Sequence, residues 1–248
     1  FGHPAFRLPR REIVHMPREL THEPTLIRRV NRWIWELARF ALPIGPVLVG
    51  LVWFRAMELA STQLSPALFR LVALPLGVLA ALATLIFGIV AMKWLLSGRV
   101  KPGTHALWSC WCSRWDFLYV AWGMWASVPL TFLDGTLLLV AYLRLMGCKI
   151  GRRALLGGGF SQVVDPDMLH FGDDVTVDAL FQAHTFEDRV LKVDHVHLRD
   201  GCTIGANTVI LYGADIGPRA TVAPHSVVMK RETLLADTRY QGAPTQPA

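Results

Sequence analysis

Branched aliphatic residues recur at every sixth position through the last fifth of the chain. The series is Leu198, Ile204, Ile210, Ile216, Val222 and Val228. A series of small residues follows, each four positions after an aliphatic one: Cys202, Thr208, Ala214, Ala220 and Ser226. Neither an α-helix nor a flat strand repeats every six residues, whereas each side of a parallel β-helix places one aliphatic side chain inside and a small residue near the corner. The pattern predicts a parallel β-helix from about Ile150 to Pro244.

The six-residue pattern is interrupted between Leu180 and Leu198, which predicts a loop expelled from the coil. This loop contains the segment His184-Thr185-Phe186-Glu187-Asp188-Arg189. Within the regular part, Gly205 and Gly217 each follow an inward-pointing position. We expect a turn at these two positions to require glycine, since glycine adopts backbone conformations that other residues tolerate poorly.

The N-terminal half is apolar enough to predict membrane-spanning helices. Hydrophobic residues make up 52% of the 248 residues, and the mean hydropathy is +0.36. No charged residue occurs over 40–54 or over 71–92, and as a helix the second run would extend about 33 Å against a hydrocarbon core of about 30 Å. A buried helix of a soluble protein is the alternative, but such a helix needs a polar face. We therefore predict a transmembrane hairpin.

Positive charge flanks both ends of this predicted hairpin, and the formal net charge is +6. Arginines precede the first apolar run at positions 7, 10, 11, 18, 28, 29, 32 and 39, and Lys93, Arg99 and Lys101 follow the second. The positive-inside rule then places both ends in the cytoplasm, so we expect a multi-pass protein of the inner (cytoplasmic) membrane with a cytoplasmic β-helix. Anionic lipid is the expected partner of the arginines, and nucleic acid is not expected because no recognition motif accompanies them.

Shorter patterns divide the rest of the N-terminal half. Leu26 to Leu37 has apolar residues at helical spacing beside arginines, which predicts an amphipathic helix at the bilayer surface with Trp33 and Trp35 as anchors. The tryptophan-rich stretch over 108–145 contains charged residues, so we expect interfacial or re-entrant helices there. The predicted divisions are a linker from a preceding unit over 1–24, membrane and interfacial helices over 25–149, the β-helix over 150–244 and a tail over 245–248.

The segment Ile204-Gly205-Ala206-Asn207-Thr208-Val209 and its neighbours resemble the left-handed β-helix of hexapeptide-repeat acyltransferases. Asp134-Gly135-Thr136, Tyr142-Leu143-Arg144-Leu145-Met146-Gly147, the 184–189 segment and the predicted hairpin together resemble the C-terminal tandem units of poly-lysine synthases and related peptide-synthetase-like proteins. The fold class that this resemblance implies is membrane α plus β. A transmembrane helical hairpin and interfacial helices would be followed by a left-handed parallel β-helix.

The resemblance also implies an activity and its partners. The unit would be an acyltransferase-like enzyme that forms amide or isopeptide bonds in poly-amino-acid synthesis. Its donor would be a phosphopantetheine-linked aminoacyl thioester on a carrier-protein domain, and its acceptor the amine of an amino acid or oligomer. No cofactor or metal is expected to bind directly. The likeness of Gly242-Ala243-Pro244 to Gly2-His3-Pro4-Ala5 suggests a tandem array, which family precedent makes a pseudo-trimer of homologous units.

Amide formation from a thioester needs a base for the attacking amine, and His184 is the candidate because its place in the motif matches the histidine that the resemblance implies. Glu187 is the second catalytic candidate, since it or Asp188 would orient the imidazole. Asp188 and Arg189 are candidates for substrate binding, with Arg189 pairing with a carboxylate. The alternative is that Glu187, Asp188 and Arg189 form a solvated cluster of ion pairs.

Two further groups of residues have competing interpretations. Asp165 and Asp167 would hold the ammonium group of an amino-acid acceptor, or they form a turn around Pro166. His195 and His197 alternate on one strand face, but a surface pair is favoured over a metal site because no third ligand is evident.

Two other function classes remain open from the sequence. One is a non-catalytic structural copy that completes the active sites of a tandem pseudo-trimer. The other is a membrane-bound acyltransferase that uses acyl-coenzyme A.

Overall fold

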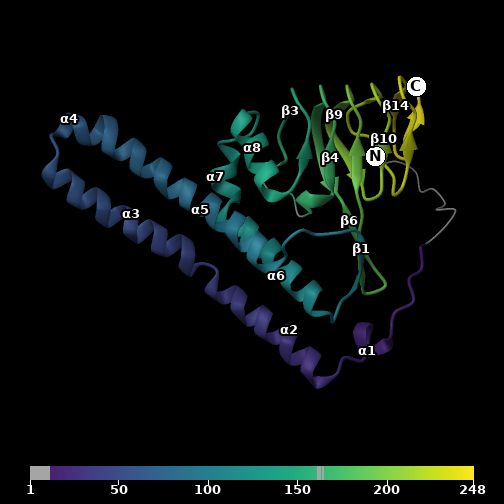
Figure 1. Ribbon diagram of the computed structural model, residues 1–248, viewed down its shortest axis with the longest axis horizontal. Helices are drawn as coiled ribbons and strands as arrows, with labels where there is room; N and C mark the ends of the chain where they lie inside the picture. Colours follow the sequence, from purple (N-terminus) through teal and green to yellow (C-terminus); the bar gives the residue numbers. More distant parts are fainter. Residues whose placement is uncertain (1–11, 161–162, 164) are drawn as a thin grey trace.

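The computed structural model describes residues 12–160, 163 and 165–248, and it consists of a long helical hairpin beside a stack of short strands (Figure 1). Residues 1–11 of the predicted linker, which include Gly2-His3-Pro4-Ala5, lie outside the described residues. The helices are α1 (Arg18–Thr21), α2 (Leu26–Ala38), η1 (Arg39–Ala41), α3 (Ile44–Gln63), α4 (Pro66–Leu68), the π-helical turn η2 (Phe69–Ala73), α5 (Leu74–Leu96), α6 (Cys110–Trp125), α7 (Ser127–Thr131) and α8 (Leu137–Met146).

Helices α3 and α5 form the predicted apolar hairpin, with α4 at its tip. Two helical segments, Arg18–Gln63 and Pro66–Leu96, have the length and hydropathy of a membrane span. In each segment only 6% of the 18-residue apolar stretch is buried. A core helix of a soluble protein would be mostly buried. The two apolar helices that the uncharged runs predict are therefore present, and they project from the rest of the molecule (Figure 1).

Helix α2 continues the line of α3 across the short turn η1, as Figure 1 shows. This differs from the predicted helix in the plane of the bilayer surface. If α3 crosses a bilayer along its own axis, a collinear α2 is directed away from the bilayer. The two predicted anchors also differ in their surroundings. Trp33 is 57% exposed, whereas the ring of Trp35 packs edge-on against that of Phe117 of α6, with 5.3 Å between the centroids.

Helices α6 to α8 connect the hairpin to the strands. Trp122 of α6 and Leu139 and Leu143 of α8 are almost completely buried in the common core, so this region is more than an interfacial surface. Gly147 ends α8 with φ +113°, a conformation suited to glycine, and a Cβ there would lie 2.2 Å from Asp167 Oδ1. The helix end and Asp167 are thereby held in close contact.

The strands wind into a parallel coil with three sides. They are β2 (Lys149–Ile150), β3 (Leu155–Leu156), β4 (Leu169–Phe171), β5 (Thr176–Gln182), β8 (Val196–Leu198), β9 (Thr203–Leu211), β10 (Asp215–Ile216), β11 (Thr221–Val222), β12 (Val227–Val228), β13 (Thr233–Leu234) and β14 (Arg239–Gln241). Ile216 pairs in register with Leu198 on one side and Leu234 on the other, so one turn of the coil takes 18 residues. Residues 245–248, predicted as a tail, include β15 (Gln246–Pro247), which pairs antiparallel with β14.

The six-residue pattern is confirmed by burial. The aliphatic series from Leu198 to Val228 and the small series from Cys202 to Ser226 are all at most 2% exposed. The corners form a third series, in which every sixth residue has positive φ: Gly201, Asn207, Gly213, Arg219, His225, Arg231 and Asp237.

Gly205 and Gly217 have a different role from the predicted one, since neither has positive φ. An added Cβ on either would lie 2.6 Å from a backbone nitrogen of the next coil. These two glycines are required by close packing of the coils.

The interruption in the repeat forms a β-hairpin. Strands β6 (His184–Glu187) and β7 (Val190–Val193) pair antiparallel, and β1 (Gly103–Ala106) adds to β7 as a third strand. Asp188 and Arg189 form the two-residue turn with φ +53° and +63°, which matches the right-handed twist of paired strands. The predicted expelled loop is therefore an ordered strand pair, and His184 stands where it leaves the coil.

Candidate active site

His184 lies next to a buried carboxylate. Its Nδ1 is 2.7 Å from Oδ2 of Asp165, and the two side chains are 17% and 1% exposed. Because a carboxylate only accepts hydrogen bonds, the Nδ1–H group donates to Asp165, and Nε2 remains available to the pocket. The structure thus forms the histidine–carboxylate pair that a general base needs.

Trp115 of α6 holds the other side of Asp165. Its indole Nε1–H donates to Asp165 Oδ1 at 2.9 Å, and its ring meets that of His184 edge to face at 4.9 Å. The carboxylate therefore has one partner on each oxygen, which offsets the cost of burying its charge. Helix α6 and strand β6 are held at this point by one three-residue cluster.

A pocket of about 470 Å³ opens beside His184. It lies between α6 and the outer face of strands β5 and β9. Its eight lining residues are Trp115, Asp116, Tyr119, Leu180, Phe181, Gln182, His184 and Val209, and none of these is lysine or arginine.

Asp116 contributes a carboxylate to this pocket and pairs with arginines of α2 and η1. Its Oδ2 is 2.6 Å from Arg32 Nη2 and 3.4 Å from Arg39 Nη2. Neither arginine lines the pocket. The pocket lining therefore carries one carboxylate beside aromatic side chains, and the two arginines that pair with that carboxylate are not part of the lining.

Glu187 does not orient His184, contrary to the sequence prediction. Successive side chains of a strand point to opposite faces, and these two residues of β6 are an odd number of positions apart. Glu187 pairs with Lys230 and lies 3.3 Å from Lys192 Nζ. The Lys230 ammonium group holds the pKa of Glu187 below its ordinary value. Asp165 takes the orienting position instead.

Asp188 and Arg189 lie in the turn at the far end of the β6–β7 hairpin. At about 3.3 Å per strand residue, they are more than 10 Å along the strand from His184. Arg189 donates to the backbone oxygen of Thr21 at 3.4 Å. The structure therefore does not bring the predicted substrate-binding pair to the pocket.

Asp167 is also separated from the pocket, although it follows Asp165 by two residues. Its Oδ2 is 2.8 Å from Lys93 Nζ, and both side chains are at most 2% exposed. The backbone N–H of Val100 donates to the same oxygen at 3.0 Å. Asp167 thus binds an ammonium group of the protein itself and ties α5 to the start of β4. Of the two predicted ammonium ligands, Asp165 holds His184 and Asp167 holds Lys93.

His195 and His197 do have a third neighbour, His170. The Nδ1 atoms of His170 and His197 are 3.2 Å apart, and the His170 and His195 ring centroids are 4.5 Å apart. Burial and the two neighbouring rings lower the pKa of His170 to about 4. Across the described ranges, no group of three or more His, Cys, Asp or Glu side chains is arranged to hold a metal ion.

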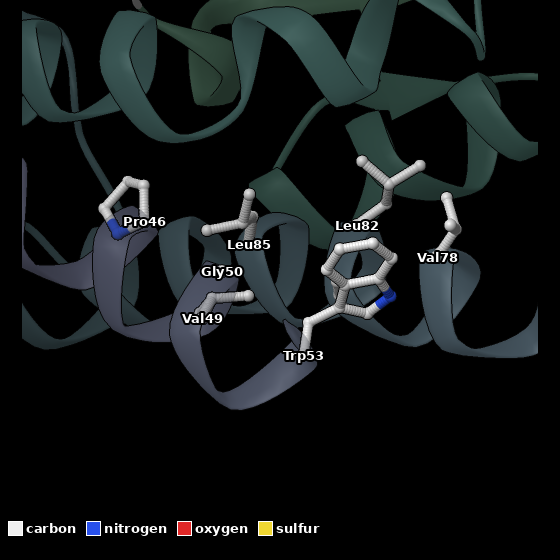
Figure 2. A pocket seen from close by; sticks show the side chains of 8 residues that line it. Pro46, Val49, Gly50, Trp53, Val78, Leu82 and Leu85 are labelled. Carbon is white, nitrogen blue, oxygen red and sulfur yellow. The ribbon is translucent and has the colours of Figure 1, made fainter. Parts of the chain in front are cut away.

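A second cavity, of about 260 Å³, lies within the helical hairpin (Figure 2). It is lined by Pro46, Val49, Gly50, Trp53, Val78, Ala81, Leu82 and Leu85. None of these side chains is an acid or a base in the physiological range, so this cavity has no group for proton transfer.

Comparison with known proteins supports the predicted six-residue repeat. Residues 195–230 match the family described as bacterial transferase hexapeptide (six repeats). The chain carries a transferase hexapeptide repeat. The predicted hexapeptide repeat is thus confirmed over residues 195–230. A curated relative, delta-poly-L-ornithine synthetase from Acinetobacter baumannii (strain AB307-0294), is 28% identical over 264 residues. That match covers 100% of this chain but 19% of the relative, so the chain spans about a fifth of its length.

Two solved structures show a looser likeness. A hexapeptide-repeat acetyltransferase from Vibrio cholerae, complexed with acetyl coenzyme A, is 20% identical with a TM-score of 0.39, covering 49% of this chain and 82% of its own. Serine acetyltransferase from Neisseria gonorrhoeae, in complex with serine, is 18% identical with a TM-score of 0.31, covering 92% and 99%. At these TM-scores neither likeness bears on the site.

Several pocket residues have no signal in the sequence. Trp115, Asp116 and Tyr119 share one face of α6 by helical spacing, but no local pattern places that face against His184, 69 residues after Trp115. His105 on β1 does not line the pocket but lies near Asp165. The ring of His105 stacks on that of Trp111, with 3.6 Å between the centroids. Burial lowers the pKa of His105 and outweighs the opposite effect of the nearby Asp165.

Proposed function

We propose that this chain is a membrane-anchored acyltransferase unit that forms amide bonds. It transfers an aminoacyl group from a carrier-bound thioester to the amine of an amino acid or oligomer. The observation that carries the proposal is the buried Asp165–His184 pair, which opens to the 470 Å³ pocket. The apolar α3–α5 hairpin supports anchoring in a membrane. The arginines and lysines that flank the hairpin favour a cytoplasmic β-helix.

The step that we assign to His184 is general base catalysis. As the acceptor nitrogen attacks the thioester carbonyl carbon, Nε2 takes a proton from that nitrogen and the carbonyl oxygen becomes an oxyanion. When the tetrahedral intermediate collapses, the C–S bond breaks, and the imidazolium returns the proton to the departing thiolate. Asp165 stabilises the imidazolium between these two events, since its carboxylate is 2.7 Å from Nδ1.

The lining of the pocket favours an amine-bearing substrate over an anionic one. Asp116 and the rings of Trp115 and Tyr119 attract a cation by charge and by cation–π interaction. A diamino acid such as ornithine, the residue named in the relative, fits this lining. We propose it as the class of acceptor.

The test is amide formation by the full-length protein in membranes, supplied with a carrier-bound aminoacyl thioester. His184→Ala should reduce the rate by about 10²- to 10⁴-fold, the usual contribution of a positioned base. His225→Asn is the matched control, because His225 is an exposed corner residue with φ +59°, which asparagine tolerates. An unchanged rate in His184→Ala would identify the unit as a structural copy in a tandem pseudo-trimer. Product from acyl-coenzyme A without a carrier would identify a coenzyme A-dependent acyltransferase.

A further inference from the structure

The outward face of α2 and α3 carries an apolar stripe that the proposed catalysis does not use. Its residues follow one another at spacings of four and three: Leu26, Val30, Trp33, Leu37, Phe40 and Ile44. The same spacing continues through Val47, Leu51 and Phe54, and every member is at least 41% exposed. An apolar repeat of 3.5 residues kept over four heptads is the pattern of a coiled-coil seam.

This seam faces away from the rest of the chain. Helix α2 contacts α6 through Arg32 and Trp35, and α3 contacts α5 through Val49 and Trp53, which border the cavity of Figure 2. With 3.6 residues per turn, the seam lies roughly 150° around the helix axis from these contacts. The chain's own elements therefore leave it uncovered.

The hydrocarbon core of a bilayer is too thin to cover the whole length of the seam. From Leu26 to Phe54 the seam extends about 42 Å at 1.5 Å per residue, whereas the hydrocarbon core is about 30 Å thick. Helix α3 alone fills that thickness, and α2 continues its line (Figure 1). The part from Leu26 to Leu37 then lies beyond the hydrocarbon. This step rests on the membrane crossing of α3 and α5 given under the proposed function.

We propose that the seam binds the same seam of a second copy of this chain, with the two helices side by side and parallel. A parallel arrangement follows because both hairpins enter one membrane from the same side. The nine side chains are on average a little over half exposed, so they offer at most about 800 Å² if each contributes about 150 Å² when fully exposed. This upper limit is comparable with the roughly 800 Å² per partner of a stable protein interface.

Disulfide crosslinking of the full-length protein in membranes tests the contact. Exposed Cys110 is first replaced by serine, and Val30→Cys or Arg29→Cys is then introduced. Both positions are exposed on α2, but only Val30 belongs to the seam. Under mild oxidation Val30→Cys should give a species of twice the mass on a non-reducing gel, and Arg29→Cys should not. Absence of that species, or equal amounts from the two variants, would overturn the proposal.

A spin label on the Val30→Cys side chain shows whether a second copy, lipid or water covers the seam. A second copy predicts low collision rates with both oxygen and a water-soluble nickel chelate. High oxygen access would show that lipid covers α2, and high nickel access that water does; either result rejects the contact. A label on Leu79→Cys, which is 61% exposed on α5, reports the membrane crossing separately. Nickel access at that position would refute the membrane placement itself.

Discussion

Replacing Asp165 by asparagine tests the proposed mechanism at its central contact. The substitution keeps the shape of the side chain and leaves an amide oxygen that can still accept from Trp115 Nε1. The amide NH₂ group then faces His184 and donates to Nδ1, so the proton of the neutral ring moves to Nε2. In that tautomer Nε2 cannot take a proton from the attacking amine.

The expected loss follows from the contact that is removed. A hydrogen bond to a charged group contributes about 1.5–3 kcal/mol, and each 1.36 kcal/mol of barrier is a factor of ten in rate. Loss of this contact alone would lower kcat/KM by roughly 10- to 150-fold, with most of the change in kcat. Because the wrong tautomer also disables Nε2, the loss in Asp165→Asn should exceed that range and approach the loss in His184→Ala, about 10²- to 10⁴-fold.

The decisive assay combines the two substitutions, because residues that act as one unit are not additive. If Asp165 acts through His184, Asp165→Asn should cause almost no further loss in a His184→Ala background. A loss of equal size in both backgrounds, together with a raised KM for the acceptor, would refute this reasoning. It would return Asp165 to the role of an ammonium ligand. Circular dichroism of each variant shows whether it is folded, so that a loss of activity through unfolding can be recognised.

Other expectations follow from neighbouring contacts. Trp115→Phe removes one donor to Asp165 while keeping a ring beside His184, so kcat should fall by less than in Asp165→Asn, measured in the same amide-forming assay. Lys93→Met leaves the Asp167 carboxylate buried without its ion-pair partner, which should lower the free energy of unfolding by about 3–5 kcal/mol in denaturant titrations; adding Asp167→Leu should recover part of that loss. The pKa of His170, lowered to about 4 from an ordinary value near 6.5, means that the unfolded chain binds the proton more readily. Stability should therefore fall between about pH 6.5 and 4, and His170→Asn should reduce that fall in thermal unfolding curves.

The errors in the predicted site have identifiable physical causes. Proximity in the chain favours Glu187 as the partner of His184, but because this segment is a strand, an odd separation puts the two side chains on opposite faces. Asp165 and Asp167 look equivalent in sequence. In the folded chain one meets His184 and the other meets Lys93, because the turn of 3₁₀-helix over Pro166–Met168 directs them to different elements. His184 itself is a prediction from its motif.

The features that repeat along the chain can be predicted from its sequence. The six-residue period specifies a β-helix, and the uncharged runs specify two long apolar helices, because burial at a regular interval requires nothing from distant segments. Tertiary structure alone decided which groups surround His184. Asp165 lies 19 residues before it and Trp115 lies 50 residues before Asp165, and a hydrogen bond forms only when such distant side chains are positioned within a few tenths of an ångström. No local period encodes that positioning, which depends on how α6, the coil and the β6–β7 hairpin pack together.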